Sequence, residues 1–184
     1  CCVDLESTLF SGQVFRWRKS DAWYFGVIYD QVVKIKQIDN GIEVHCDNKD
    51  EFFVAQLLSK YFNLDLDIVE IYNKLPNDEF IQNPIKKYKG MRILKQDPWE
   101  CLISFICSSV SNIKRISKNI EDLCVNLGDT IHLGSYSRQS FPKPEDIVYA
   151  GPELLRELKL GFRCEYIYQS AKMIKSGIVD LDNL

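Results

Sequence analysis

The chain separates strand-type sequence from helix-type sequence. Between residues 12 and 46, four segments are rich in aromatic and β-branched side chains: FRWR, WYFGVIY, VVKIKQI and IEVHC. Turn-forming residues lie between these segments, and Asn40-Gly41 is typical of a hairpin turn because both residues tolerate positive φ. We therefore predict three or four antiparallel strands across residues 12–46.

From residue 51 onward, apolar residues recur mainly at helical spacing. One boundary is especially clear, since Asp97 can cap a helix that has Pro98 at its first position and Glu100 at its third. The helix that follows is almost uncharged, so we expect it to be central, with Trp99 and Phe105 in the core. Residues 129–142 are expected to form a loop. The other predicted helices cover 51–62, 66–75, 78–88, 113–127, two short segments opened by Pro144 and Pro152, and 163–176.

Strands followed by helices predict an α+β fold, with an N-terminal antiparallel β-sheet domain and then an α-helical domain. We place the boundary within residues 86–97 and divide the chain into 1–90 and 91–184. The chain of 184 residues contains no run of about 18 apolar residues, so no transmembrane helix is expected. The first residues do not resemble a signal peptide. Because the initiator Met is missing, the chain is expected to be processed, trimmed or cut from something longer.

The net charge of −3 hides an uneven distribution. Residues 86–118 contain eight Lys and Arg but only two acidic residues, whereas residues 1–80 contain eight Lys and Arg and fourteen acidic residues. A basic stretch of this kind is either a footprint for phosphate groups or a solvated lysine-rich surface. The seven Cys form no CxxC motif and the two His are far apart, so we expect free thiols rather than a zinc site.

Three segments carry a resemblance when they are taken together. They are SGQVFRW (Ser11–Trp17), DPWECLISFICSSVSNIKRI (Asp97–Ile116) and LKLGFRCEYI (Leu158–Ile167). In this order and spacing the chain resembles the 8-oxoguanine DNA glycosylases/AP lyases of the helix–hairpin–helix superfamily. The resemblance implies a β domain, a helical domain and a hairpin that is followed by a catalytic Lys and Asp. No GVGxK-like hairpin follows Gly177. We therefore expect the catalytic half to be absent, the chain alone to be inactive, and no catalytic residue to lie in it.

The resemblance also implies roles for individual residues. Gly12 matches the glycine whose carbonyl faces N7 of the flipped base; alternatively it only shapes a bend at a strand edge. Arg115 and Arg163 match the arginines that hydrogen-bond the orphaned cytosine, or else they are solvated arginines at helix ends. Phe162 matches the aromatic residue that wedges into the base stack; the alternative is a core residue. Four residues are expected to hold the β domain against the helices: Gln13, Phe15, Arg16 and Trp17.

One departure from the family pattern concerns the residues after Cys-Ser-Ser. The family usually has three Asn there, the first of which fills the space left by the flipped base. This chain has Val110-Ser111-Asn112, so only the last Asn is kept. Val110 can fill space but cannot hydrogen-bond cytosine, which leaves the preference for the base opposite the lesion open. Asn112 contacts DNA or serves only as the N-cap of its helix.

The function implied by the resemblance is base-excision DNA repair. The complete enzyme would flip 8-oxoguanine out of duplex DNA, excise it and cleave the strand as an AP lyase. Two alternatives are a non-catalytic module that binds DNA lesions and an unrelated α+β protein-interaction domain. The first interpretation implies double-stranded DNA containing an oxidised purine as partner, no metal or organic cofactor, no membrane, and a monomer. It also implies an intracellular location, in the nucleoid and cytoplasm or in a nucleus.

Overall fold

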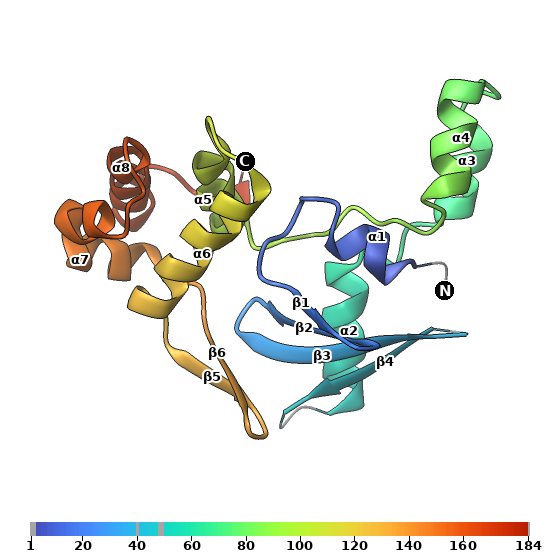
Figure 1. Cartoon of the computed structure of the whole chain (residues 1–184), viewed down its shortest axis with the longest axis horizontal. Coiled ribbons are helices and arrows are strands. Elements are labelled where there is room, and N and C mark those ends of the chain that lie inside the picture. The colour runs from blue at the N-terminus through green and yellow to red at the C-terminus, as the bar shows by residue number, and fades with distance from the viewer. Residues whose placement is uncertain (1–2, 40, 48–49, 184) are drawn as a thin grey trace. The chain divides into compact units, whose positions relative to one another are not determined.

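The computed structural model describes residues 3–39, 41–47 and 50–183. They form two compact units, which are treated separately below (Figure 1). The first unit contains the residues up to Ile28 together with Val32–Lys95, and the second contains Tyr29–Gln31 with the residues from Gln96 onward. The division of the chain at residues 90 and 91 stays a prediction. Among the described residues, no helix is both long enough and apolar enough to cross a membrane.

The first unit contains a four-stranded sheet in the order β1-β2-β3-β4. Strands β1 and β2 pair antiparallel, as do β3 and β4. This confirms the predicted N-terminal antiparallel sheet, although Asn40 of the predicted hairpin turn lies outside the described residues. The strands are β1 (Arg18–Ser20), β2 (Trp23–Ile28), β3 (Gln31–Ile38) and β4 (Gly41–Cys46).

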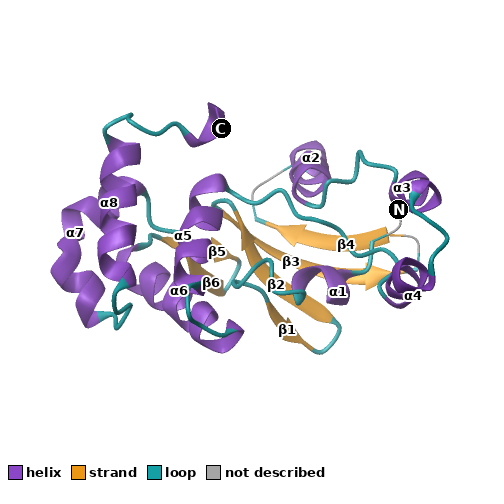
Figure 2. Ribbon diagram, turned by 90° about the horizontal axis from the view of Figure 1, so that it is seen from above, coloured by secondary structure: helices purple, strands orange, loops and turns teal. Residues whose placement is uncertain are grey.

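One face of this sheet forms the core of the first unit. Alternating residues of β3, such as Val33 and Ile35, are fully buried, as expected for a sheet with one covered face. Helix α2 (Glu51–Tyr61) lies beside the sheet (Figures 1 and 2). The indole Nε1 of Trp17 donates a buried hydrogen bond to the Tyr61 hydroxyl at 3.0 Å. Trp17 therefore joins the sheet to the helix.

Three shorter helices complete the first unit. They are α1 (Leu5–Leu9), α3 (Ile68–Lys74) and α4 (Glu79–Lys87). Asp4, Asp67 and Asp78 cap them, each accepting hydrogen bonds from backbone N–H groups of the first turn. The two helices predicted near 66–75 and 78–88 are therefore present as α3 and α4. They line an apolar cavity of about 310 Å³ together with the segment that follows them.

The second unit is mainly helical, with α7 and α8 side by side (Figure 2). Asp97 caps α5 as predicted, accepting a hydrogen bond from the Glu100 N–H at 2.9 Å. Gly151, with φ of 77°, interrupts α7, in agreement with two predicted short helices. The elements are α5 (Pro98–Ser108), α6 (Ile113–Leu127), α7 (Pro144–Glu157), α8 (Arg163–Lys175) and a 3₁₀ turn η1 (Leu181–Asn183).

Two predictions for the second unit are wrong. Residues 129–142 are not a plain loop, because β5 (Thr130–Leu133) and β6 (Tyr136–Gln139) form an antiparallel hairpin. The signal was a Gly-Ser pair at 134–135, which forms the two-residue turn with Gly134 at φ of 57°. Phe105 was expected in the core but is 75% exposed. Helix α5 packs against α6 and α8, and Phe105 lies off that packed face.

Candidate functional site

Gly12 lies in a bend between α1 and β1, outside the sheet ladder. Its φ is 91°, a left-handed conformation that L side chains rarely adopt. Within the described part of the chain, no hydrogen bond to the Gly12 carbonyl is recorded. The bend is tied to the end of α1, since the Ser11 hydroxyl donates to the Thr8 carbonyl at 3.0 Å. The bend is therefore fixed at Ser11, while the Gly12 carbonyl has no hydrogen-bond partner among the described residues.

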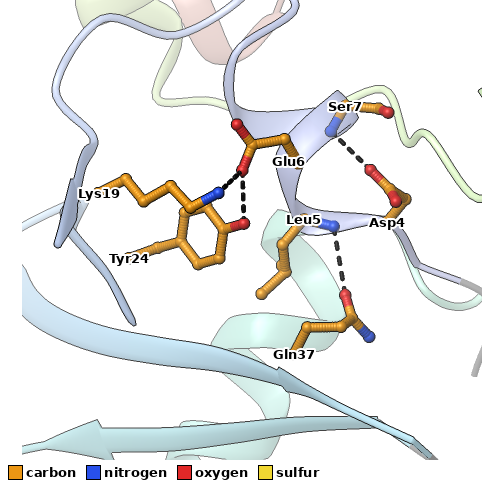
Figure 3. A network of polar contacts seen from close by, with 7 residues as sticks. All are labelled: Asp4, Leu5, Glu6, Ser7, Lys19, Tyr24 and Gln37. Atoms are coloured by element: carbon orange, nitrogen blue, oxygen red, sulfur yellow. Dashed lines mark hydrogen bonds and ion pairs between the residues drawn. The ribbon is translucent and has the colours of Figure 1, made fainter. Parts of the chain in front are cut away.

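A polar network holds α1 against the sheet just before this bend (Figure 3). The Glu6 carboxylate accepts hydrogen bonds from the Lys19 ammonium and from the Tyr24 hydroxyl, the latter at 2.7 Å. The Lys19 ammonium holds the pKa of the Glu6 carboxyl below its ordinary value, and Tyr24 adds to this effect. Burial raises the pKa of Tyr24. Gln37 on β3 also accepts a hydrogen bond from the Leu5 N–H at 3.3 Å.

In the second unit, Arg163 holds the turn between α5 and α6. Its side chain is 2% exposed, and one guanidinium NH₂ donates to the carbonyls of Ser109 and Val110, the latter at 3.1 Å. The other NH₂ donates to the Leu160 carbonyl at 3.2 Å, and Nε has no partner among the described residues. The structure therefore does not show Arg163 as the solvated arginine of the alternative interpretation.

The turn that Arg163 holds presents an apolar side chain to solvent. Val110 has φ of 48° and is 87% exposed. A left-handed conformation is unusual for a β-branched residue and costs conformational energy. Phe162, next to Arg163, is 54% exposed rather than buried, and its ring lies 4.6 Å from the Arg163 guanidinium carbon. Arg163 therefore contacts the backbone of Val110 and the ring of Phe162, two residues whose apolar side chains are exposed.

Asn112 and Arg115 lie at the start of α6. The Asn112 side chain accepts a hydrogen bond from the Arg115 N–H at 3.0 Å, so Asn112 is an N-cap. Helix capping alone is therefore sufficient to explain an asparagine at position 112, although Asn112 is exposed. Arg115 is also exposed, and no partner of its guanidinium is recorded within the described ranges. Arg115 can therefore donate to an external ligand.

The basic stretch over residues 86–118 is divided between the two units. Residues up to Lys95 belong to the first unit, and Lys114 to Lys118 belong to the second. Arg92 is only 6% exposed, and its guanidinium donates to backbone carbonyls. Lys118 pairs with Asp122 on the same helix at 2.7 Å. Fewer cations are therefore available to phosphate groups than the eight Lys and Arg of residues 86–118 suggested.

The five cysteines that the structure describes are free thiols, as predicted: Cys46, Cys101, Cys107, Cys124 and Cys164. Burial raises the pKa of Cys107 to about 11. A thiol with such a pKa is almost wholly protonated near neutral pH and is a poor nucleophile.

An antiparallel sheet followed by a mainly helical unit is an α+β fold. The chain belongs to the 8-oxoguanine DNA glycosylase family, because residues 2–102 match the family model of the 8-oxoguanine DNA glycosylase N-terminal domain. This confirms the resemblance predicted from the three sequence segments.

Full-length relatives agree with this assignment. The chain is 34% identical over 188 residues to the N-glycosylase/DNA lyase of Saccharomyces cerevisiae, a match that covers 92% of this chain and 49% of that protein. It is 33% identical over 174 residues to N-glycosylase/DNA lyase OGG1 of Arabidopsis thaliana, covering 90% of this chain and 47% of the relative. The chain therefore spans about half the length of the curated relatives it matches.

Solved structures have the same fold. MBOgg1 in complex with a low affinity DNA ligand matches with a TM-score of 0.91 and 36% identity, over 97% of this chain and 62% of that chain. The 8-oxoguanine glycosylase/lyase of Clostridium acetobutylicum, in complex with double-stranded DNA containing cytosine opposite 8-oxoG, matches with a TM-score of 0.91 and 27% identity. That match covers 98% of this chain and 62% of the neighbour. The predicted α+β fold is therefore confirmed.

Proposed function

We propose that this protein recognises 8-oxoguanine in duplex DNA and takes part in its base-excision repair. In the complete enzyme, recognition would precede excision of the base and cleavage of the strand by AP lyase activity. Membership of the 8-oxoguanine DNA glycosylase family is the observation that carries this proposal, together with relatives named N-glycosylase/DNA lyase. A base inside a duplex is inaccessible, so the lesion must be flipped out of the stack.

Gly12 is proposed to read the lesion through its carbonyl. Guanine presents N7 as an acceptor, whereas 8-oxoguanine carries a hydrogen on N7 and is a donor there. A carbonyl facing N7 would bind the lesion but would face an unpaired lone pair in guanine, a mismatch that costs about 1–3 kcal/mol when buried. The left-handed φ of Gly12 and its unpaired carbonyl support this role.

The helical unit is proposed to contact the strand opposite the lesion. Arg115 is the stronger candidate to donate to the orphaned cytosine, because its guanidinium is exposed. Arg163 is the weaker candidate, because it is 2% exposed and one of its NH₂ groups is bound to the Ser109 and Val110 carbonyls. Phe162 is proposed as the wedge beside the lesion, since its ring is exposed and apolar wedges can enter base steps. Asn112 is proposed as an auxiliary polar contact besides being an N-cap.

The partner proposed for this site is double-stranded DNA containing an oxidised purine, bound by a monomer. No metal or organic cofactor is needed for the proposed recognition. A protein that acts on DNA in this way works inside the cell, in the nucleoid and cytoplasm of a prokaryote or in a eukaryotic nucleus.

Binding and trapping experiments test the function on the complete protein, meaning the protein expressed from its complete reading frame. Fluorescence anisotropy would compare one duplex carrying 8-oxoguanine opposite cytosine with the identical duplex carrying guanine. A 2′-fluorine on the lesion nucleotide would slow excision during the measurement, since it disfavours positive charge on the sugar. Borohydride would then be added to an unfluorinated lesion duplex to trap any Schiff base.

We expect preferential binding of the lesion duplex and a trapped covalent complex. Preferential binding without trapping would favour the non-catalytic lesion-binding module. Equal affinity for the two duplexes would refute the proposed function.

A glycine substitution tests the role of position 12. Gly12→Ala should weaken binding of the lesion duplex much more than binding of the guanine duplex, because an L residue displaces the carbonyl from its left-handed position. Gly134→Ala is the matched control, since Gly134 also has positive φ, with open space around its Cβ position, but lies in the β5-β6 turn. Equal losses on both duplexes would remove Gly12 from the recognition role.

A further inference from the structure

Gln13, the residue after Gly12, has its side-chain amide fully engaged with backbone groups. Its Nε2 donates to the Thr8 carbonyl at 3.0 Å and to the Arg92 carbonyl at 2.9 Å. Its Oε1 accepts a hydrogen bond from the Leu94 N–H at 3.0 Å. These three bonds connect the Gly12 bend to the end of α1 on one side, and to a segment about eighty residues further along the chain on the other.

That distant segment, residues 90–94, is here called the strap. It runs alongside residues 4–13 in the same direction without forming a sheet ladder. The Asp4 N–H donates to the Gly90 carbonyl at 2.8 Å, and the Arg92 N–H donates to the Thr8 hydroxyl at 3.1 Å. Backbone groups of the strap are therefore satisfied largely by side chains, and Gln13 supplies the bonds nearest to Gly12.

The strap is itself fixed to the body of the first unit. The Arg92 guanidinium, which is 6% exposed, donates to the Leu66 carbonyl at 2.7 Å and to the Asn63 carbonyl at 3.2 Å. The Lys95 N–H donates to the Tyr61 carbonyl at 2.9 Å, which ties the end of the strap to α2. The partner of Gln13 is thus a rigid support rather than a loose loop.

We propose that Gln13 is a positioning residue that sets the direction of the Gly12 carbonyl and so determines discrimination between 8-oxoguanine and guanine. The inference rests on the proposed function of Gly12. Glycine has more backbone freedom than other residues, so its carbonyl keeps one direction only if its neighbours hold it. Three hydrogen bonds from the Gln13 side chain to two segments anchor this residue, and its backbone nitrogen belongs to the same peptide group as the Gly12 carbonyl. Gln13 need not touch DNA to act in this way.

The test compares two Gln-to-Met substitutions in the complete protein. Gln13→Met keeps the length of the side chain and removes all three hydrogen bonds. Gln37→Met is the matched control, because it removes two hydrogen bonds from the same unit, to the Leu5 N–H and the Gly41 carbonyl, without reaching the strap. The readout is the ratio of the dissociation constants of the guanine and 8-oxoguanine duplexes, measured with the fluorinated lesion described above.

We expect Gln13→Met to lower this ratio about tenfold, because a Gly12 carbonyl that is no longer held in one direction loses part of its discrimination between an N7 donor and an N7 acceptor. Gln37→Met should leave the ratio unchanged, because its hydrogen bonds do not reach the strap. Amide hydrogen exchange at Leu94 should become faster in Gln13→Met only, which reports the broken contact directly.

The outcomes separate the two proposals. If the unsubstituted protein shows no lesion preference, the proposed function fails. If it shows a preference that Gln13→Met retains, or that both Met variants lower equally, the positioning role of Gln13 is refuted while the proposed function stands.

A second variant guards against a folding defect in Gln13→Met. Gln13→Glu places a carboxylate against the carbonyls of Thr8 and Arg92, so it should lose the lesion preference at pH 8. When the pH is lowered, the new carboxyl takes up a proton and can again donate one hydrogen bond to one of these carbonyls. The preference for the lesion duplex should then return in part. A pH profile identical to that of the unsubstituted protein would contradict the positioning role.

Discussion

Gly26 is the position at which the structure makes the sharpest prediction about stability. It lies on β2, directly beneath the ring of Trp17. A Cβ atom added at this position would lie 2.4, 2.5 and 2.6 Å from three atoms of that ring. Contacts shorter than 3.0 Å essentially never occur for real Cβ atoms, so Gly26→Ala must displace Trp17.

The displacement has a calculable size. An ordinary contact begins at 3.4 Å, so the ring must retreat by about 1 Å. Trp17 is 3% exposed, and its buried hydrogen bond to Tyr61 would be stretched. Overpacking of a core costs about 1–3 kcal/mol and a lost hydrogen bond about 1 kcal/mol, while reduced freedom of the unfolded chain returns about 0.4–1 kcal/mol. We therefore expect a net loss of about 2 kcal/mol.

Thermal and urea unfolding, followed by circular dichroism, would measure this loss. A decrease of about 2 kcal/mol corresponds to a melting temperature lower by about 4–8 °C for a chain of this size. Gly41→Ala is the matched control, because nothing lies within 4 Å of its Cβ position. It should be neutral or stabilising by up to about 1 kcal/mol.

A double-mutant cycle provides the decisive comparison. Trp17→Phe makes the ring that faces the new methyl group smaller, so Gly26→Ala should destabilise the Trp17→Phe background less than the unsubstituted protein. Equal stability of Gly26→Ala and Gly41→Ala, or strict additivity in the cycle, would refute the steric reasoning.

Two further predictions concern charged side chains. Arg115→Ala should reduce the preference of the complete protein for a duplex with cytosine, rather than adenine, opposite the lesion. The control Lys114→Ala should weaken binding to these two duplexes equally, because it loses only phosphate attraction. An unchanged preference in Arg115→Ala would contradict its role in reading cytosine. The lowered pKa of Glu6, caused first by Lys19, predicts stability that is present above its ordinary pKa of 4.5 and is lost as the pH falls through the lower folded-state value. The difference in unfolding free energy between the unsubstituted protein and Glu6→Gln should therefore shrink toward acid, and a difference that is constant with pH would argue against the network.

Local signals in the sequence sufficed for most of the elements. Three kinds of signal were visible because they depend on neighbours within a few residues: the caps at Asp97 and Asn112, the aromatic and β-branched residues of the strands, and the proline-led helices. The hairpin of β5 and β6 was missed although its Gly134-Ser135 turn was a usable signal. Phe105 was misplaced because an apolar residue on a helix does not reveal whether another element covers its face.

The sequence by itself determined the order of strands and helices, and the three segments that identify the family. Only the tertiary structure decided that Arg163 is buried, that Val110 takes a left-handed conformation, and that Gln13 bonds to Arg92 and Leu94. Those contacts join residues between 53 and 81 positions apart. Local propensities act over a single turn or strand, so they cannot specify which distant backbone groups a side chain will reach once the chain has folded.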